Sequence, residues 1–405
     1  MNNPNRIAIV WEQNEWGGVD SYLEYLLNSW PNQSDQIVIL HNKGNKGAIR
    51  LKNLLSSNEN VTFREIDVTF KYYPWLNMLT IFKKILSHIF IPILFLSSVI
   101  KYKKLFDHEK FDVVIGQNGG YPGSYGVLSS LFAAKKAGVK VVSLVVHHAA
   151  TKPILMHGWF RMIIEKKLGN GILSSVIAVS NVTKDSLIRN TYFFDQQKCH
   201  VIVIENGIPI PNKRVEKVSN PHDNFRIGML GRLEPYKGHD DFLCALSMVS
   251  QECLDKIKVQ FFGGYTDTDY VRLTSIIKNL DLEGKVDILG YVDSSVSRII
   301  TDLDLVVMVT KTFEGFGLTV IEALHQNVPV LATNVGVVSD LFPNGGELIV
   351  DVGDFNEMAR QIEKIVLSNE NDKFIPQHIK DKLWKYDSKH MANRYYQHFM
   401  FELIK

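Results

Sequence analysis

The sequence predicts an α/β protein built from two doubly wound parallel-sheet domains that face each other. Apolar, strand-sized runs alternate with helical patterns, and the alternation restarts at Phe225 after a polar, proline-containing linker over 209–224. In the second half, Leu303–Thr333 reads as a strand, a glycine loop, a helix and a strand, the unit of such sheets. We expect domains over 1–210 and 211–384, and we allow for a helix over about 385–405 that packs back on the first domain.

Composition and charge limit the function classes. With 405 residues, 45% of them hydrophobic, the chain can bury two ordinary cores. The formal net charge of +2 hides an asymmetry, since residues 1–210 carry 23 Lys+Arg against 15 Asp+Glu (+8) and the rest carry 22 against 28 (−6). A basic half suggests an anionic surface or substrate. Three cysteines without metal spacing favour a reducing, cytoplasmic compartment, and no secretory signal is expected because the run Ile7–Trp11 soon meets Glu12.

The first half holds the strands of one sheet. Buried strands are expected at Arg6–Trp11, Gln36–His41, Asn60–Ile66, Phe111–Gln117, Val139–Val146, Val176–Ser180 and Cys199–Ile204. A turn with Gly17 and Gly18 leads from the first strand into a helix over Ser21–Trp30. Its glycines let backbone come close to a ligand beside a positive helix N-terminus, and an ordinary tight turn is the alternative.

The stretch Tyr72–Phe106 stands apart from the alternation. Its segment Ile85–Ile100 carries no formal charge, is rich in Ile, Leu and Phe, and has lysines on both sides. It is too short for a confident bilayer span and is interrupted by Pro92. Two alternatives stay open, a helix packed on the sheet with a lysine-rich edge and an interfacial helix resting on anionic lipid headgroups.

A histidine doublet, His147 and His148, ends the fifth expected strand, where ligands of a parallel sheet lie. A neutral imidazole there could hydrogen-bond a sugar hydroxyl, and a structural role for one of the two stays open. No further His, Cys or carboxylate lies at ligand spacing, so no metal is expected.

The second half repeats the pattern and supplies cations. Strands are expected at Arg226–Leu230, Lys258–Gly264, Val286–Leu289, Leu303–Val309 and Val328–Ala332. Arg232 and Lys237 follow the first of these strands, where a guanidinium can fork two phosphate oxygens and an ammonium supplies a point charge. Gly290–Val292 follows the third strand, as a turn whose backbone groups could meet a base.

The loop after Val309 carries the strongest signal. Gly315 and Gly317 allow a bulky anion to approach, and the N–H groups of Phe316, Gly317, Leu318 and Thr319 at the helix start would donate to it. Glu322, inside the helix, can accept from vicinal hydroxyls such as those of a ribose, and Glu314 would face whatever lies beyond the phosphates. A solvated loop glutamate and an ordinary helix glutamate are the alternative for this loop alone.

Four motifs together resemble one family. GGVD near the start, VIENGIP before the linker, GRLEPYKG and TFEGFGLTVIEALHQNVPVLAT are similar to the retaining GT-B glycosyltransferases marked by E-x7-E, glycosyl transferases group 1. The resemblance implies two Rossmann-like domains across a cleft, an acceptor-binding first and a nucleotide-sugar-binding second. Arg232 and Lys237 would hold the diphosphate, Glu322 the ribose and Glu314 the donor sugar. Gly17 and Gly18 would approach the donor, and His147 or His148 would face the transferred sugar.

The implied activity is retaining, metal-independent sugar transfer from a UDP- or GDP-linked donor, without a cofactor. The basic half and Tyr72–Phe106 favour a glycan or lipid-linked glycan acceptor in bacterial surface polysaccharide or lipopolysaccharide synthesis, with no nucleic-acid partner. The enzyme would be cytoplasmic or peripheral at the inner face of the plasma membrane. The alternatives are a noncatalytic nucleotide-sugar-binding protein and a GT-B sugar-phosphate synthase or phosphorylase.

Overall fold

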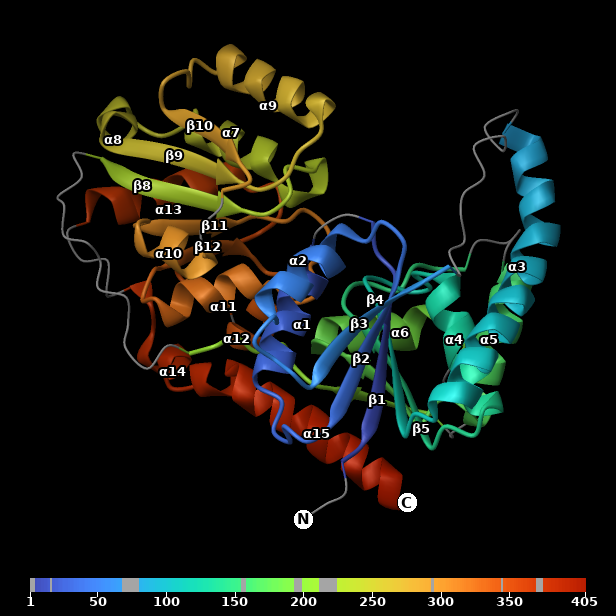
Figure 1. Ribbon diagram of the computed structural model, residues 1–405. Helices are drawn as coiled ribbons and strands as arrows, with labels where there is room; N and C mark the ends of the chain where they lie inside the picture. The colour runs from blue at the N-terminus through green and yellow to red at the C-terminus, as the bar shows by residue number, and fades with distance from the viewer. Residues whose placement is uncertain are drawn as a thin grey trace. The chain divides into compact units, whose positions relative to one another are not determined.

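The computed structural model describes residues 4–14, 17–67, 80–153, 158–192, 199–210, 224–292, 295–343, 345–368 and 374–405, with backbone alone over 80–89. The chain divides into two compact units (Figure 1). The first unit comprises Met1–Gly207 and Ser388–Lys405, and the second comprises Ile208–Asp387.

A seven-stranded parallel sheet in the order β3-β2-β1-β4-β5-β6-β7 forms the first unit. The strands are β1 Arg6–Trp11, β2 Gln36–Asn42, β3 Val61–Ile66, β4 Val113–Asn118, β5 Val141–Val146, β6 Ser175–Ala178 and β7 His200–Val203. Each overlaps a predicted run, because strands covered on both faces are largely apolar. Strands β2, β4 and β6 extend one residue beyond their runs, to Asn42, Asn118 and Ser175. The direction of the strand order reverses between β1 and β4, so the switch point of the sheet lies between these two central strands.

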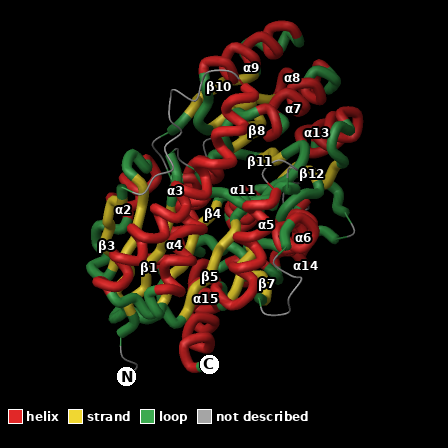
Figure 2. Tube along the Cα trace, turned by 90° about the vertical axis from the view of Figure 1, so that its right-hand side faces the viewer, coloured by secondary structure: helices red, strands yellow, loops and turns green. Residues whose placement is uncertain are grey.

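Helices flank these strands (Figure 2). They are α1 Gly18–Asn28, α2 Lys46–Leu54, α3 Thr80–Glu109, α4 Tyr125–Lys136, α5 Gly158–Lys167 with the π-helical turn Leu168–Ile172, α6 Asn181–Asn190 and α15 Ser388–Ile404. Helix α1 begins at Gly18 rather than at the predicted Ser21, because the Asp20 carboxylate accepts from the N–H of Gly17 at 2.8 Å and so starts the helix earlier. Helix α6 is capped by Ser180, whose side chain accepts from the N–H of Thr183.

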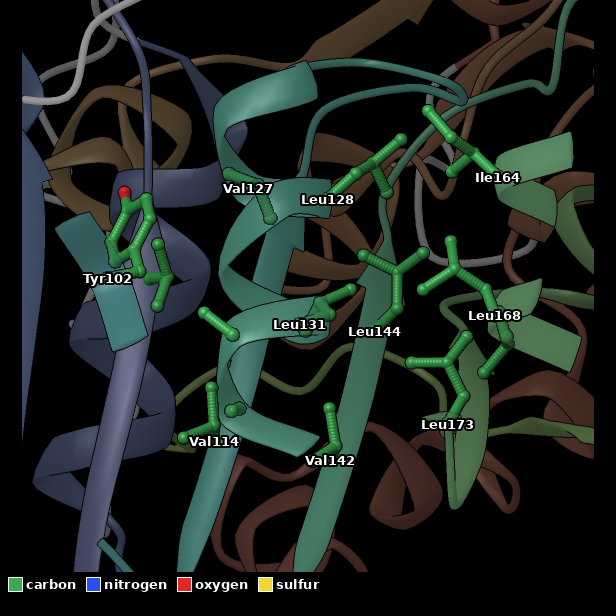
Figure 3. Close-up of a cluster of buried hydrophobic side chains, with 14 of the residues drawn as sticks. Tyr102, Val114, Val127, Leu128, Leu131, Val142, Leu144, Ile164, Leu168 and Leu173 are labelled. Atoms are coloured by element: carbon green, nitrogen blue, oxygen red, sulfur yellow. The ribbon is translucent and has the colours of Figure 1, made fainter. Parts of the chain in front are cut away.

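The core of the first unit lies between the sheet and the helices α3, α4 and α5. Figure 3 shows Val127, Leu128 and Leu131 of α4 between Tyr102 of α3 on one side and the strand residues on the other. Beyond them Ile164 of α5, Leu168 and Leu173 extend the same cluster. This packing holds α3 against α4, so the long helix is part of the fold.

Helix α3 contains the unusual apolar stretch, of which 72–79 lies outside the described residues. Four of its side chains are buried in the core, namely Phe95, Val99, Tyr102 and Phe106. One face therefore packs on the unit, as the first of the two alternatives requires. Over the described part of the chain, no helix combines the length and apolarity that crossing a membrane requires.

A six-stranded parallel sheet in the order β10-β9-β8-β11-β12-β13 forms the second unit. The strands are β8 Phe225–Leu230, β9 Ile257–Phe262, β10 Val286–Gly290, β11 Leu305–Met308, β12 Val330–Thr333 and β13 Ile349–Val350. Every strand except β13 overlaps a predicted run, and β8, β9, β10 and β12 each extend one residue beyond theirs. The two residues of β13 are too few for a pattern. Strands β8 and β11 are neighbours at the switch point of this sheet.

The helices of the second unit begin with the short 3-10 turn η3 Pro235–Lys237. They continue as α7 His239–Leu246, α8 Gln251–Lys256, α9 Asp267–Asn279, α10 Val296–Thr301, α11 Leu318–His325, α12 Val337–Leu341, α13 Phe355–Leu367, α14 Gln377–Lys380 and the 3-10 turn η5 Leu383–Tyr386. Polar caps start several of them, such as Thr266, which accepts from the N–H of Asp269 at 3.2 Å before α9. This unit has a core of its own around Phe242, Phe261 and Leu305.

Candidate active site

The predicted site residues fall into two sets, one in each unit. In the second unit they follow the carboxyl ends of three strands of one sheet: Arg232 and Lys237 after β8, Gly290 and Val292 at and after β10, and Glu314, Phe316, Gly317, Leu318, Thr319 and Glu322 after β11. Since β8 and β11 pair in parallel at the switch point, their following loops meet. The sheet therefore brings Lys237 to Glu314 although 77 residues separate them.

An ion pair joins the two loops. Lys237 Nζ donates to Glu314 Oε2 at 2.6 Å, and the two side chains are only 21% and 15% exposed. Burial alone would lower the pKa of Lys237, but the charge of Glu314 and the hydrogen bond to it outweigh burial and raise that pKa. Lys237 is therefore a firmly cationic side chain in a partly buried place, where a charge acts more strongly than in water.

Backbone geometry explains why Lys237 sits there. Gly238, which follows it, has φ +83°, and a Cβ on it would lie 2.0 Å from the carbonyl oxygen of Val309. The N–H of Lys311 donates to the carbonyl of Tyr236 at 2.8 Å. The loops after β8 and β11 are thus packed backbone against backbone, and only glycine fits at position 238.

Arg232, the other predicted phosphate ligand, has a different partner. Its Nη1 lies 2.8 Å from Glu234 Oε1, and the two side chains are 50% and 31% exposed. An exposed pair of this kind contributes little to stability. The guanidinium keeps further N–H donors for a ligand, since five are available in all.

The loops after β8, β9 and β10 are joined by main-chain hydrogen bonds. Gly231 N donates to Phe262 O, and Gly263 N donates to Gly290 O, both at 2.8 Å. Gly263 packs so closely that a Cβ on it would lie 2.0 Å from Gly231 O. Gly290, at φ +67°, ends β10 beside these loops, and Val292 lies two residues further along the chain. These contacts fix the backbone over which a predicted base would lie.

The loop before α11 is built on glycines. Gly317 is left-handed at φ +98° and caps α11, and the neighbouring loop packs on it so that Val337 N donates to Phe316 O. The Phe316 side chain is buried and contacts the Tyr386 ring at 5.8 Å between centroids, so it belongs to the core and only its backbone faces the loop. Glu322 is 9% exposed, more buried than an ordinary surface helix glutamate.

Thr310 is a site residue that the sequence pattern did not single out. Its hydroxyl lies 3.4 Å from Glu314 Oε2, so the carboxylate of Glu314 lies between a cation and a hydroxyl donor. A polar residue directly at the end of an apolar strand is the signal that could have identified it.

In the first unit, Gly17 and Gly18 lie between β1 and α1. Neither has a left-handed backbone, and a Cβ on Gly18 would meet no described atom within 4 Å. The described part of the turn thus does not require glycine at position 18 for its geometry. The free space leaves room for a ligand to approach the start of α1.

His147 lies beside the same helix. Its Nε2 lies 2.8 Å from Gln117 Oε1, and its ring contacts Tyr22 of α1 edge to face at 4.5 Å between centroids. Burial lowers the pKa of His147 to about 3, so the imidazole is neutral at physiological pH. His148 is half-buried and lies next to Gly120.

Glu12, at the end of β1, is a second group that sequence reasoning missed. Its carboxylate accepts from the Ser124 hydroxyl at the start of α4 and lies 3.4 Å from the Tyr102 hydroxyl. Burial raises the pKa of Glu12, although both hydrogen bonds act in the opposite direction. Only the fold brings α3, α4 and β1 together, so no local pattern could have shown this cluster.

The stability of the second unit is expected to depend on pH through His239, which follows Gly238. This side chain is 1% exposed, and neither ring nitrogen has a hydrogen-bond partner among the described residues. Burial, followed by the charge of Arg272, lowers its pKa to about 4. The unfolded chain takes up a proton near pH 6.5 and the folded chain does not. The contribution of neutral His239 to the free energy of unfolding is therefore fully present above about pH 6.5. It decreases as the pH falls toward 4, by up to about 1.4 kcal/mol per pH unit.

The variant His239→Phe is expected to remove this part of the acid sensitivity while filling the same space against Phe261. Urea unfolding at pH 7.5 and 5.5 measures it, and the loss of stability between the two should be smaller than in the wild type by about 1 kcal/mol. His378→Ala, at an exposed position, is the control. An unchanged pH dependence in His239→Phe would contradict the expectation.

Among the described residues, no group of three or more His, Cys, Asp or Glu side chains could hold a metal ion.

Comparisons with known proteins relate the chain to glycosyltransferases. Residues 212–381 match the family model of glycosyl transferases group 1. The chain is similar to the capsular polysaccharide biosynthesis glycosyltransferase CapM of Staphylococcus aureus, 25% identical over 67% of this chain and 71% of CapM. It is also similar to the O-antigen biosynthesis glycosyltransferase WclY of Escherichia coli, 22% identical over 61% of this chain and 68% of WclY. Several other relatives are matched over less than half of their own length.

Among solved structures, the chain resembles Anabaena HepE, crystallised with UDP and glucose. The TM-score is 0.71 at 18% identity, over 98% of this chain and 99% of HepE. At this level of identity, the structural likeness shows the fold alone. The likeness confirms the predicted GT-B architecture of two parallel-sheet α/β units.

Proposed function

The chain belongs to the glycosyl transferases group 1 family, and from that premise we propose that it moves a sugar, with retention of anomeric configuration, from a nucleotide-diphosphate donor to a hydroxyl of a glycan or lipid-linked glycan. The donor is UDP- or GDP-linked, and the reaction uses neither a metal nor another cofactor. Capsule and O-antigen enzymes among the relatives support a place in bacterial surface polysaccharide synthesis.

The observation that carries the proposal is the ion pair of Lys237 and Glu314 at the switch point of the second sheet. An ammonium has three donors, so Lys237 can keep Glu314 and still give two N–H groups to a phosphate. Because it is paired with Lys237, Glu314 then lies next to the diphosphate, in position to bind hydroxyls of the attached sugar. Glu322, on the buried side of α11, is assigned to the ribose.

The chemical need is to stabilise the leaving group. Departure of the nucleotide diphosphate leaves negative charge on its outer phosphate, and a partly buried cation lowers the energy of that charge in the transition state. Lys237 and Arg232 supply the cations, and the backbone N–H groups of Leu318 and Thr319 at the start of α11 add donors. The acceptor hydroxyl enters on the same face of the sugar, and its proton passes to the departing phosphate.

The first unit is assigned the acceptor and one side of the donor. A neutral His147 can hydrogen-bond a sugar hydroxyl without adding charge to an oxocarbenium-like centre. Gly17 and Gly18 leave the start of α1 open to the donor. With a lipid-linked acceptor the enzyme works at the inner face of the plasma membrane as a peripheral protein, and its three free thiols accord with a reducing compartment.

Slow donor hydrolysis tests the proposal. Incubation with UDP- and GDP-sugars is expected to release nucleoside diphosphate from one of them, because water can replace the acceptor hydroxyl. The anomeric configuration of the first sugar released, read by proton NMR, is expected to match that of the donor. A protein that binds a nucleotide sugar and releases no diphosphate, with or without glycan acceptors, would be a noncatalytic binder and would contradict the proposal.

A further inference from the structure

The outer face of α3 is apolar and exposed. Phe90, Ile93, Leu96 and Ile100 are 37%, 55%, 60% and 58% exposed. They are three or four positions apart, so they form one stripe along the helix, opposite the face buried in the core. Soluble proteins commonly expose single apolar side chains, but a continuous stripe of large ones marks a surface with a partner.

Helix α5 continues this apolar surface. Trp159 and Ile163, four positions apart, are 47% and 40% exposed. The two helices meet where the rings of Phe95 and Phe160 pack edge to face, with 5.6 Å between centroids. Leu96 follows Phe95 in the chain, and Trp159 precedes Phe160. Both neighbours are exposed apolar residues. We call these six exposed side chains of α3 and α5 the apolar surface.

The charges around the apolar surface favour an anionic partner. Lys101 and Lys104 follow the stripe on α3, and Lys166 and Lys167 end α5. The carboxylates of these two helices are already paired. Asp107 pairs with Lys103, Glu109 with Arg6 and Arg64, and Glu165 with Arg161. The remaining lysines therefore give the surroundings of the apolar surface a positive potential.

We propose that the apolar surface of α3 and α5 docks on the surface of an anionic phospholipid bilayer. Phe, Ile, Leu and Trp side chains would enter the boundary between headgroups and acyl chains, and the lysines would remain among the phosphates. A tryptophan beside such a surface suits the headgroup level, since its ring is apolar and its N–H is polar. The inference names the membrane partner of the proposed function, and only its link to a lipid-linked acceptor rests on that function.

Vesicle flotation of the full chain tests the inference. The wild type is expected to float with phosphatidylcholine vesicles that contain phosphatidylglycerol and to float much less with phosphatidylcholine alone. Ile93→Ser combined with Leu96→Ser should lower the partition coefficient by about tenfold or more. Lys104→Glu combined with Lys167→Glu should lower it by about tenfold, with the greatest difference at low salt.

Matched controls lie elsewhere on the first unit. Ile49→Ser removes an apolar side chain that is 62% exposed on α2, and Lys136→Glu reverses an exposed charge on α4. Both should float as the wild type does. Equal flotation of all variants, or no flotation of the wild type on anionic vesicles, would overturn the inference. So would a wild-type dimer that Ile93→Ser with Leu96→Ser converts into monomer, because a second copy would then be the partner.

Donor hydrolysis without vesicles separates this inference from the proposed function. The docking variants should hydrolyse the donor as the wild type does, since α3 and α5 carry none of the proposed site residues. Absence of hydrolysis in every variant and in the wild type would count against the proposed function and would leave the flotation result intact.

Discussion

Lys237→Ala is expected to lower the rate of donor hydrolysis at saturating donor by more than about a hundredfold, the scale for loss of one electrostatic contact to a developing charge. The Lys237 side chain is only 21% exposed and its Nζ lies 2.6 Å from Glu314 Oε2, so water cannot readily replace it. If Lys237 acts mainly on the leaving group, the loss will appear in kcat more than in KM.

Two variants show whether this loss is chemical or structural. Lys258→Ala removes another lysine of the second unit, one paired with Asp287 at 3.1 Å, and should leave hydrolysis unchanged. Lys237→Ala combined with Glu314→Gln removes both charges, so a loss caused by an unpaired Glu314 alone would be relieved in this double variant. A rate for Lys237→Ala within a factor of a few of the wild type would refute the role assigned to the side chain.

Gly238→Ala is expected to destabilise the second unit by about 2–4 kcal/mol. The backbone has φ +83°, where a side chain is disfavoured, and the new Cβ would lie 2.0 Å from the carbonyl oxygen of Val309. The loops after β8 and β11 would have to move apart, and that movement would also separate Lys237 from Glu314. Urea unfolding of the full chain measures the loss of stability.

Gly284→Ala is the matched control for the backbone. Gly284 has a similar φ of +76°, but nothing lies within 4 Å of its added Cβ. This substitution should lower the free energy of unfolding by about 1–2 kcal/mol, because only the left-handed backbone conformation is disfavoured. It should leave donor hydrolysis unchanged. Equal destabilisation by the two substitutions would show that the approach to Val309 has no importance.

The alternation of strands and helices was predictable because each parallel strand is covered on both faces. Runs such as Val141–Val146 must then be apolar throughout, and such runs are visible without any structure. The same rule placed Lys237 and Glu314 at the carboxyl ends of their strands. It could not bring them to 2.6 Å, since that contact depends on the pairing of β8 with β11 and on the turn at Gly238.

Helix α3 shows where the sequence pattern was insufficient. Periodicity distinguishes a buried face from an exposed one only when the exposed face is polar. Here Phe95 and Val99 are buried while Ile93 and Leu96 are exposed, and all four are apolar. The two alternatives for this stretch could not be separated from the sequence, because both faces of the helix are apolar. His147 was uncertain for a similar reason, since its contacts with Gln117 and Tyr22 come from distant parts of the chain.

The return of α15 to the first unit has a consequence for biosynthesis. Tyr395 and Phe399 are fully buried there, and Ser175 lies 2.8 Å from His398 across this contact. These residues leave the ribosome only after all of Ile208–Asp387. The first unit therefore cannot complete its core until the whole of the second unit has been synthesised. A stop codon just before Ser388 would thus damage the domain that is translated first.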